Sequence, residues 1–181
     1  MKKKIALCLL LIIILFTSLS CRSKEIAEEN IDIGEIEHPD IIFEDVNYTI
    51  GEEGIFPIYI EAKSIKIYQE KKLTVLEEIS FIQKDENENI VMTGSCDEAK
   101  IENETYNANL NGKVILNRPI DELTIKSENL DFDYQNQVIK TDKDVILKYN
   151  EGNEIDGTGL TCDFLNSIYE FDRINKGTIM Q

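Results

Sequence analysis

The sequence has little of what catalytic and metal sites most often use. Its one histidine, His38, stands beside Pro39 in an acidic, polar segment. A lone histidine there cannot complete a Ser–His–acid or Cys–His set with a folded domain. The four cysteines include no close pair, so no zinc motif is present. We therefore expect no enzyme activity, no cofactor and no metal site.

Positive charge is also scarce. The chain has 19 Lys and Arg against 35 Asp and Glu, which gives a formal net charge of -16. Phosphate groups would be repelled, and no basic patch offsets that repulsion, which argues strongly against nucleic-acid binding. The same charge argues against adhesion to an anionic membrane surface by electrostatics alone. We assign the acidity mainly to keeping the domain soluble.

Residues 1–21 read as a signal peptide or membrane anchor. A basic start, Lys2–Lys4, precedes an apolar run over Ile5–Leu15, and small residues lead to Cys21. A secretory signal requires these three features, and the run is shorter than the roughly 20 residues of a full span. Residues 17–21, Thr-Ser-Leu-Ser-Cys, resemble a bacterial lipoprotein processing site, although Ser18 stands where such sites usually have Leu.

Three fates of this segment stay open: lipidation at Cys21, retention as an uncleaved inner-membrane helix, or cleavage that frees the protein. Each of them places residues 22 onward outside the cytoplasm. Residues 22–40 are acidic and weakly apolar, and they read as a tether with little surface to bury. The folded domain is predicted to span residues 41–181.

The clearest strand pattern lies between Leu123 and Phe164. Apolar residues alternate with polar ones there, which puts every second side chain on one face of a sheet. We predict four short strands, separated by turns at residues 134–137, 140–143 and 150–153, where Gly, Asn and Asp tolerate the backbone angles of a tight reversal. The apolar residues of these strands are Leu123, Ile125, Leu130, Phe132, Tyr134, Val138, Ile139, Val145, Leu147, Tyr149, Ile155 and Leu160.

The preceding part of the domain follows the same plan. Strands are predicted over residues 41–48, 55–68 and 73–82, with a turn at residues 51–54. The apolar alternation changes phase between Ala62 and Ile65, which indicates a bulge or a corner. A helix is the alternative for residues 73–82, but the Thr, Val and Ile content favours a strand.

The domain also repeats itself. Segments starting at Ile60, Met92, Ile125 and Ile155 share one layout and lie about thirty residues apart, a spacing typical of stacked supersecondary units. Each is followed by a second strand, at residues 74–81, 108–116, 138–149 and 169–179. We therefore predict an all-β roll of stacked antiparallel hairpins, with chance likeness of short strands as the alternative. Small residues in each repeat suggest a shared corner: Ala62, Gly94, Ser127 and Gly157.

The order of these motifs resembles the LptC family of periplasmic lipopolysaccharide-transport proteins and the related LptA/OstA repeat. The resemblance is clearest over residues 111–165. A lipidated Cys21 would depart from the membrane helix that this family usually retains. The matching residues are Gly112, Val114 and Leu116; Leu123 to Tyr134; Thr141, Asp142, Val145 and Leu147; and Gly157, Gly159, Leu160 and Asp163.

The resemblance implies an OstA/LptA-like β-jellyroll, open along one side, that holds the acyl chains of lipopolysaccharide or a similar glycolipid. Such a protein would stand at the periplasmic face of the inner membrane, anchored by lipidated Cys21 or by an uncleaved helix. It would take lipid from the subunits of an inner-membrane ABC transporter and pass it to an LptA-like periplasmic jellyroll.

The lipid would pass between two proteins whose sheets are joined edge to edge. An exposed sheet edge allows this, because the edge strand of a partner can pair with it. The C-terminal strand, residues 169–179, is the candidate donor edge, and the strand at residues 41–48 would face the transporter. An alternative function is a lipoprotein that binds another protein through an edge strand and carries no lipid.

Several residues are candidates for the site. Gly157 and Gly159 flank Thr158, and we predict a corner leading into the last hairpin there, because no helix start follows that would favour a phosphate-binding loop. Cys96 and Cys162 either form a disulfide or remain two buried free thiols. The candidates for the lipid-binding trough, for each of which ordinary core is the alternative, are Ile65, Ile67, Phe81, Leu130, Phe132, Val145 and Leu147.

Overall fold

Most of the strands predicted by apolar alternation are present in the structure. The computed structural model describes residues 38–150 and 152–179, and these form nine β-strands and one 3-10 helix. Their bounds are β1 (Ile41–Glu52), β2 (Ile55–Tyr68), β3 (Leu73–Lys84), β4 (Ile90–Glu102), β5 (Ala108–Arg118), η1 (Pro119–Asp121), β6 (Leu123–Asp133), β7 (Val138–Tyr149), β8 (Asn153–Asp163) and β9 (Ile168–Thr178).

Some expectations fall outside these residues. The signal or anchor, the lipidation at Cys21 and nearly all of the tether belong to residues that the structure does not describe. His38 is described and is exposed, as expected for a solvated side chain. Among the described residues, no helix has the length and apolar character needed to cross a membrane.

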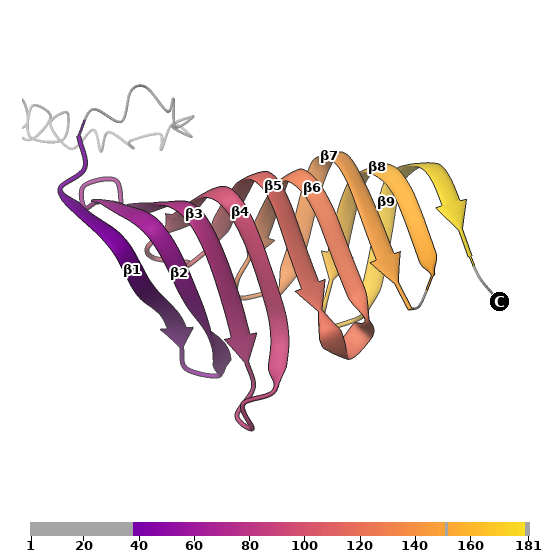
Figure 1. The fold of residues 1–181 in the computed structure, drawn as a ribbon, viewed down its shortest axis with the longest axis horizontal. Helices are drawn as coiled ribbons and strands as arrows, with labels where there is room; N and C mark the ends of the chain where they lie inside the picture. The colour runs from indigo at the N-terminus through magenta and orange to yellow at the C-terminus, as the bar shows by residue number, and fades with distance from the viewer. Residues whose placement is uncertain (1–37, 151, 180–181) are drawn as a thin grey trace, which may run out of the picture. The chain divides into compact units, whose positions relative to one another are not determined.

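All nine strands belong to one antiparallel sheet in the order of the sequence, so each strand pairs with its neighbours along the chain (Figure 1). This is an opening strand followed by the four predicted hairpins. Residues 73–82 are part of β3, so the strand prediction is confirmed over the helix alternative. The predicted turns at residues 51–54 and 134–137 are present within a residue or two of their expected bounds.

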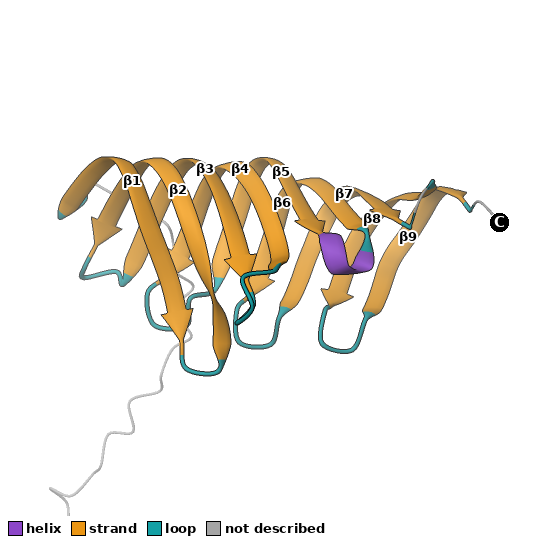
Figure 2. Ribbon diagram, turned by 60° about the horizontal axis from the view of Figure 1, so that its bottom comes forward, coloured by secondary structure: helices purple, strands orange, loops and turns teal. Residues whose placement is uncertain are grey.

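The sheet folds over along a line that crosses the middle of its strands (Figure 2). Apolar side chains fill the interior between its two halves, and we call this interior the trough. The hydrogen-bonded register is interrupted along this line, for example between Asn111 and Val114 of β5 and between Ser127 and Asp131 of β6. The alternation of buried and exposed positions also shifts by one residue there. In β2 the buried positions are Ile60 and Ala62 before the fold line and Ile65 after it, which confirms the predicted corner.

We call the two halves of the folded sheet its arms. The first arm holds the half-strands that end at residues 69–72, 103–107, 134–137 and 164–167. The second arm holds those that end at residues 53–54, 85–89, 119–122 and 150–152. One continuous hydrophobic cluster contains residues of both arms, so the arms face each other across a shared core. We call the side where the tips of the two arms meet the mouth of the trough.

One predicted turn is wrong. Residues 140–143 do not reverse the chain, because β7 continues from Val138 to Tyr149. The register with β8 shifts between Thr141 and Asp144, where β7 crosses the fold line. A bend inside a strand and a reversal between strands use the same polar residue types, so the local sequence did not distinguish them. The predicted four strands of this region are therefore three.

The predicted corner residues are also not all equivalent. Ala62 is paired with Ile79, and Ile79 with Cys96, so Cys96 occupies the β4 position that corresponds to Ala62. Gly94 lies two residues earlier, opposite Phe81. A Cβ at Gly94 would lie 2.4 Å from the Phe81 ring. Gly94 is small because it accommodates that ring, and the small-residue prediction is wrong about its place in the corner.

Candidate functional site

The seven predicted trough residues all point to the inside of the folded sheet. Ile65, Leu130, Phe132, Val145 and Leu147 belong to the buried hydrophobic core, and Ile67 and Phe81 are partly buried against it. Each full burial of such a side chain contributes about 1.5–3 kcal/mol. In this conformation the seven residues stabilise the fold, and their contact with a lipid stays a prediction.

Cross-strand pairing joins these residues into rows that run along the trough. In the first arm, one row passes from Phe43 through Ile65 to Leu76 and continues to Leu130. In the second arm, another row holds Phe81 and, further along, Leu147. The apolar interior is therefore continuous from β1 to β9.

Both ends of this interior are open. Phe43 on β1 belongs to an inward-facing row, yet 49% of it is exposed. Ile174 on β9 pairs with Gly157 on the inner face, and 58% of it is exposed. These two residues lie on the edge strands, where no further strand of residues 38–150 and 152–179 covers them. The sheet thus ends in two edges that have free backbone groups and apolar side chains.

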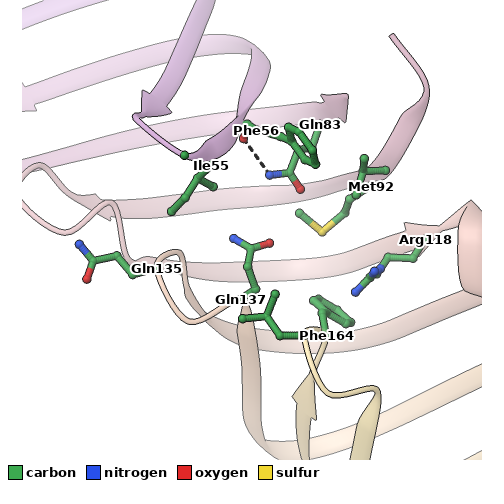
Figure 3. Close-up of a pocket in the computed structure, with 11 residues that line it drawn as sticks. Ile55, Phe56, Gln83, Met92, Arg118, Gln135, Gln137 and Phe164 are labelled. Atoms are coloured by element: carbon green, nitrogen blue, oxygen red, sulfur yellow. Dashed lines mark hydrogen bonds between the residues drawn. The ribbon is translucent and has the colours of Figure 1, made fainter. Parts of the chain in front are cut away.

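The mouth of the trough holds a pocket of about 370 Å³ between the tips of the two arms (Figure 3). Its volume is in the range of small-ligand pockets. Apolar side chains line most of it, and three glutamines and one arginine add polar groups. The lining residues are Gly54, Ile55, Phe56, Gln83, Val91, Met92, Arg118, Gln135, Gln137, Phe164 and Leu165.

Arg118 connects the two arms at one end of this pocket. Its guanidinium carbon lies 4.2 Å from the centre of the Phe164 ring, and its Nε lies 3.1 Å from Asp121 Oδ2. Arg118 ends β5 in the second arm, whereas Phe164 follows β8 in the first. A cation over an aromatic face in a largely desolvated place contributes roughly 1–2 kcal/mol. This contact holds the arm tips together.

A group of tyrosines closes the trough nearer to β1. Tyr134 is fully buried, and its ring meets the Tyr106 ring edge to face at 5.7 Å between centroids. Burial is the largest influence on the Tyr134 hydroxyl, and it raises the pKa of that group. Burial also raises the pKa of Tyr48 on β1, and Tyr106 adds to it. The hydroxyls of Tyr48 and Tyr134 therefore keep their protons to a higher pH than a free tyrosine does.

Sequence reasoning missed Arg118 and the pocket around it. Val114, Leu116 and Arg118 follow one another at period two, so Arg118 occupies an inward-facing position of β5. A charged residue in the apolar phase of a strand is a usable signal, because such positions are seldom charged without a partner. The Phe164 contact could not be found in this way, since that residue lies three strands further along.

The two glycines of β8 lie in the bend of that strand, as predicted. Gly159 has φ of +67°, and a Cβ there would lie 2.1 Å from Asp172 Oδ2. Gly157 has no such backbone angle, but a Cβ there would lie 2.6 Å from the Arg173 carbonyl oxygen. Both glycines therefore allow β9 to approach β8 closely. Their role in partner binding stays a prediction.

The cysteines of the folded domain are two buried free thiols, which was one of the two expected states. Burial raises the pKa of Cys96 and of Cys162 to about 12. Thiols with such pKa values remain protonated at neutral pH and are poor nucleophiles. Within residues 38–150 and 152–179, no three His, Cys, Asp or Glu residues gather as a metal site.

A sequence profile of the family described as "LptC: Lipopolysaccharide-assembly, LptC-related" matches residues 5–176. The chain belongs to the LptC family. Membership implies that this LptC-family protein is a component of lipopolysaccharide transport, with a periplasmic location and other transport proteins as partners. No curated protein matches the chain.

Among solved structures, this LptC-family protein is similar to LptH of Pseudomonas aeruginosa, the LptA-homologous periplasmic component of the lipopolysaccharide transport device. The identity is 12%, the match covers 70% of this chain and 96% of the LptH chain, and the TM-score is 0.60. At this identity the likeness shows the fold alone, and the predicted LptA-like β-jellyroll is confirmed.

Proposed function

We propose that this LptC-family protein carries the acyl chains of lipopolysaccharide, or of a similar amphipathic glycolipid, in the trough of its folded sheet. It receives the lipid from an inner-membrane ABC transporter and passes it to an LptA-like periplasmic jellyroll. Lipidated Cys21 or an uncleaved N-terminal helix holds it at the inner membrane. The observation that carries the proposal is the continuous apolar interior, which is open at both edge strands.

The interior suits a long apolar cargo in two respects. Its rows run along the trough from strand to strand, so a chain lying in it meets mainly apolar side chains. Its side chains are packed on one another in the present conformation, so cargo requires the arms to separate. Because the arms are joined by one bent sheet and meet otherwise through side chains, they can part at the mouth without losing strand pairing.

The edges suit a handover. At β9, the backbone groups on the side away from β8 and the exposed Ile174 would continue both the sheet and its apolar row into a partner. At β1, Phe43 offers the same combination, which we assign to the transporter side. In-line joining of two jellyrolls would then extend one trough into the next.

Photo-crosslinking tests the cargo. A photoreactive amino acid at Phe132 or Leu147 is expected to capture glycolipid in cells. The matched controls are Asp131 and Ile146, which are the neighbours of these residues on the outer face of the same strands. Capture at Leu147 but not at Ile146 would support carriage inside the trough.

The same experiment separates the alternative function. If the protein binds a partner through an edge strand and carries no lipid, neither inner probe captures glycolipid while the partner still co-purifies. Mass spectrometry of the mature N-terminus decides between lipidated Cys21, a retained helix and a cleaved signal.

A further inference from the structure

We propose that the pocket at the mouth binds the head of an anionic amphiphile, with Arg118 contacting a phosphate or carboxylate group whose apolar chain continues into the trough. The inference rests on the proposed function and adds to it the place of the cargo's head group and the residue that contacts it. Three features of the pocket support it.

The first feature is charge. Arg118 is the one charged residue among the described residues that line the pocket, and no carboxylate lines it. The chain as a whole has a net charge of -16, so most of its surface repels anions. The lining therefore offers one cation, and the carboxylate that pairs with it, Asp121, lies outside the lining.

The second feature is unused hydrogen-bonding capacity. The Arg118 side chain is 13% exposed, and its Nε is buried without a hydrogen-bond acceptor in the described residues. Asp121 Oδ2 lies 3.1 Å from this Nε and supplies a counter-charge, but it forms no hydrogen bond with it. The guanidinium has five N–H donors in a planar fork that fits two oxygens of a phosphate or carboxylate. The Phe164 ring lies against the guanidinium, 4.2 Å from its central carbon to the ring centre.

The third feature is the neighbourhood of the cation. Figure 3 shows Arg118 and Phe164 at one end of the pocket, with Met92 beside them and Ile55 and Phe56 across it. Two glutamines are fixed by donating to backbone: Gln83 to the Phe56 carbonyl at 2.9 Å and Gln137 to the Tyr134 carbonyl at 2.6 Å. An anionic head at Arg118 would have apolar surface next to it, which a free anion could not use.

The test follows the Met92 methyl group by NMR in the full chain held in zwitterionic nanodiscs. The chain has three methionines, Met1, Met92 and Met180, so ¹³C-methyl labelling gives few signals and one of them reports on the pocket. Dodecyl phosphate, dodecanol and inorganic phosphate are titrated separately. We expect dodecyl phosphate to shift the Met92 signal with an affinity about tenfold higher than dodecanol.

Variants assign the effect to Arg118. Arg118→Gln is expected to remove the preference for dodecyl phosphate, and Arg118→Lys to retain part of it because the charge remains but the planar fork is lost. The matched control is Arg173→Gln, since Arg173 lies exposed on β9, outside the pocket, and donates to Thr158 Oγ1 at 3.3 Å. That variant is expected to keep the full preference. Circular dichroism verifies that each variant is folded.

Several outcomes would overturn the inference. Equal affinity for dodecyl phosphate and dodecanol in the wild-type chain would show that the head-group charge is not recognised. Inorganic phosphate binding as tightly as dodecyl phosphate would show that the pocket takes a free anion and not an amphiphile. If none of the three probes shifts the Met92 signal, the pocket does not bind an anionic amphiphile. The proposed lipid carriage is judged separately, by crosslinking at Phe132 and Leu147.

Discussion

Phe43 and Ile65 are paired across β1 and β2 and face the same interior, yet Phe43 is 49% exposed and Ile65 is 1% exposed. The two residues differ in position and not in chemistry. Ile65 has a strand on either side, whereas β1 is the first strand of the described sheet. The apolar row therefore begins at an open edge, and a second jellyroll placed there would bury Phe43 as fully as the fold buries Ile65.

This pair gives a first prediction, on stability. Ile65→Ala is expected to lower the free energy of unfolding by about 2–5 kcal/mol, because it leaves a cavity in a closed core. Phe43→Ala is expected to cost less than about 1.5 kcal/mol, since water already reaches half of that side chain. Urea denaturation of the two variants measures the difference. Equal losses of stability would mean that the β1 edge is covered in solution.

A second prediction concerns the other edge. Ile174→Asp on β9 is expected to abolish co-purification with an LptA-like jellyroll, because it puts a charge into the apolar row that the partner would continue. The expected change in the free energy of unfolding is within about 0.5 kcal/mol, since the residue is exposed.

The matched control for that edge is Ile146→Asp. Ile146 is also an exposed isoleucine, 37% accessible, but it lies on the outer face of β7. This variant is expected to co-purify like the wild type. If Ile174→Asp also co-purifies unchanged, β9 is not the donor edge.

A third prediction tests the close approach of β8 and β9. Gly157→Ala is expected to lower the free energy of unfolding by about 1–3 kcal/mol, because the new methyl group would overlap the backbone carbonyl of Arg173. Gly177→Ala on β9 is the control, since nothing lies within 4 Å of its Cβ position. Thermal unfolding of both variants decides the matter: similar melting temperatures would show that β9 is not held against Gly157.

A fourth prediction follows from the buried thiols. In the folded protein burial raises the pKa of Cys96 and Cys162 to about 12, from an ordinary value of 9.0. Between these values the unfolded chain has lost protons that the folded chain keeps, so stability is fully present below pH 9 and falls as the pH rises towards 12. The loss is roughly 1 kcal/mol per pH unit for each thiol.

The measurement compares the wild type with a Cys96→Ala, Cys162→Ala double variant in urea at several pH values. The difference between the two unfolding free energies is expected to shrink above pH 9, because the double variant lacks these two titrations. At pH 8, Cys96 and Cys162 of the folded wild type are expected to react slowly with an aromatic disulfide reagent. Fast labelling of both thiols would show that the trough opens readily.

The fold line shows where local sequence stopped being informative. The change of phase between Ala62 and Ile65 predicted the corner in β2, because a bend that keeps apolar side chains inside must shift the alternation by one residue. At residues 140–143 the same kind of bend was taken for a turn, because Thr, Asp and Lys suit both. Pairing of Thr141 with Leu160 across the sheet is a long-range fact that decides for the bend.

The candidate site also has a part that local sequence predicted and a part that it did not. The inward phase of Leu130, Phe132, Val145 and Leu147 was predicted because side chains alternate strictly along a strand. The pocket was not, because its lining comes from the tips of strands that meet only when the sheet folds over. No local pattern brings Arg118 to Phe164.

The sequence by itself determined the strands, their meander order and the face of each that turns inward, because period-two alternation and short connections are local properties of the chain. The tertiary structure decided where that sheet folds, which edges it leaves open and that Arg118 is enclosed at the mouth. These depend on the packing of one arm against the other, and packing joins residues whose separation along the chain leaves no local signature.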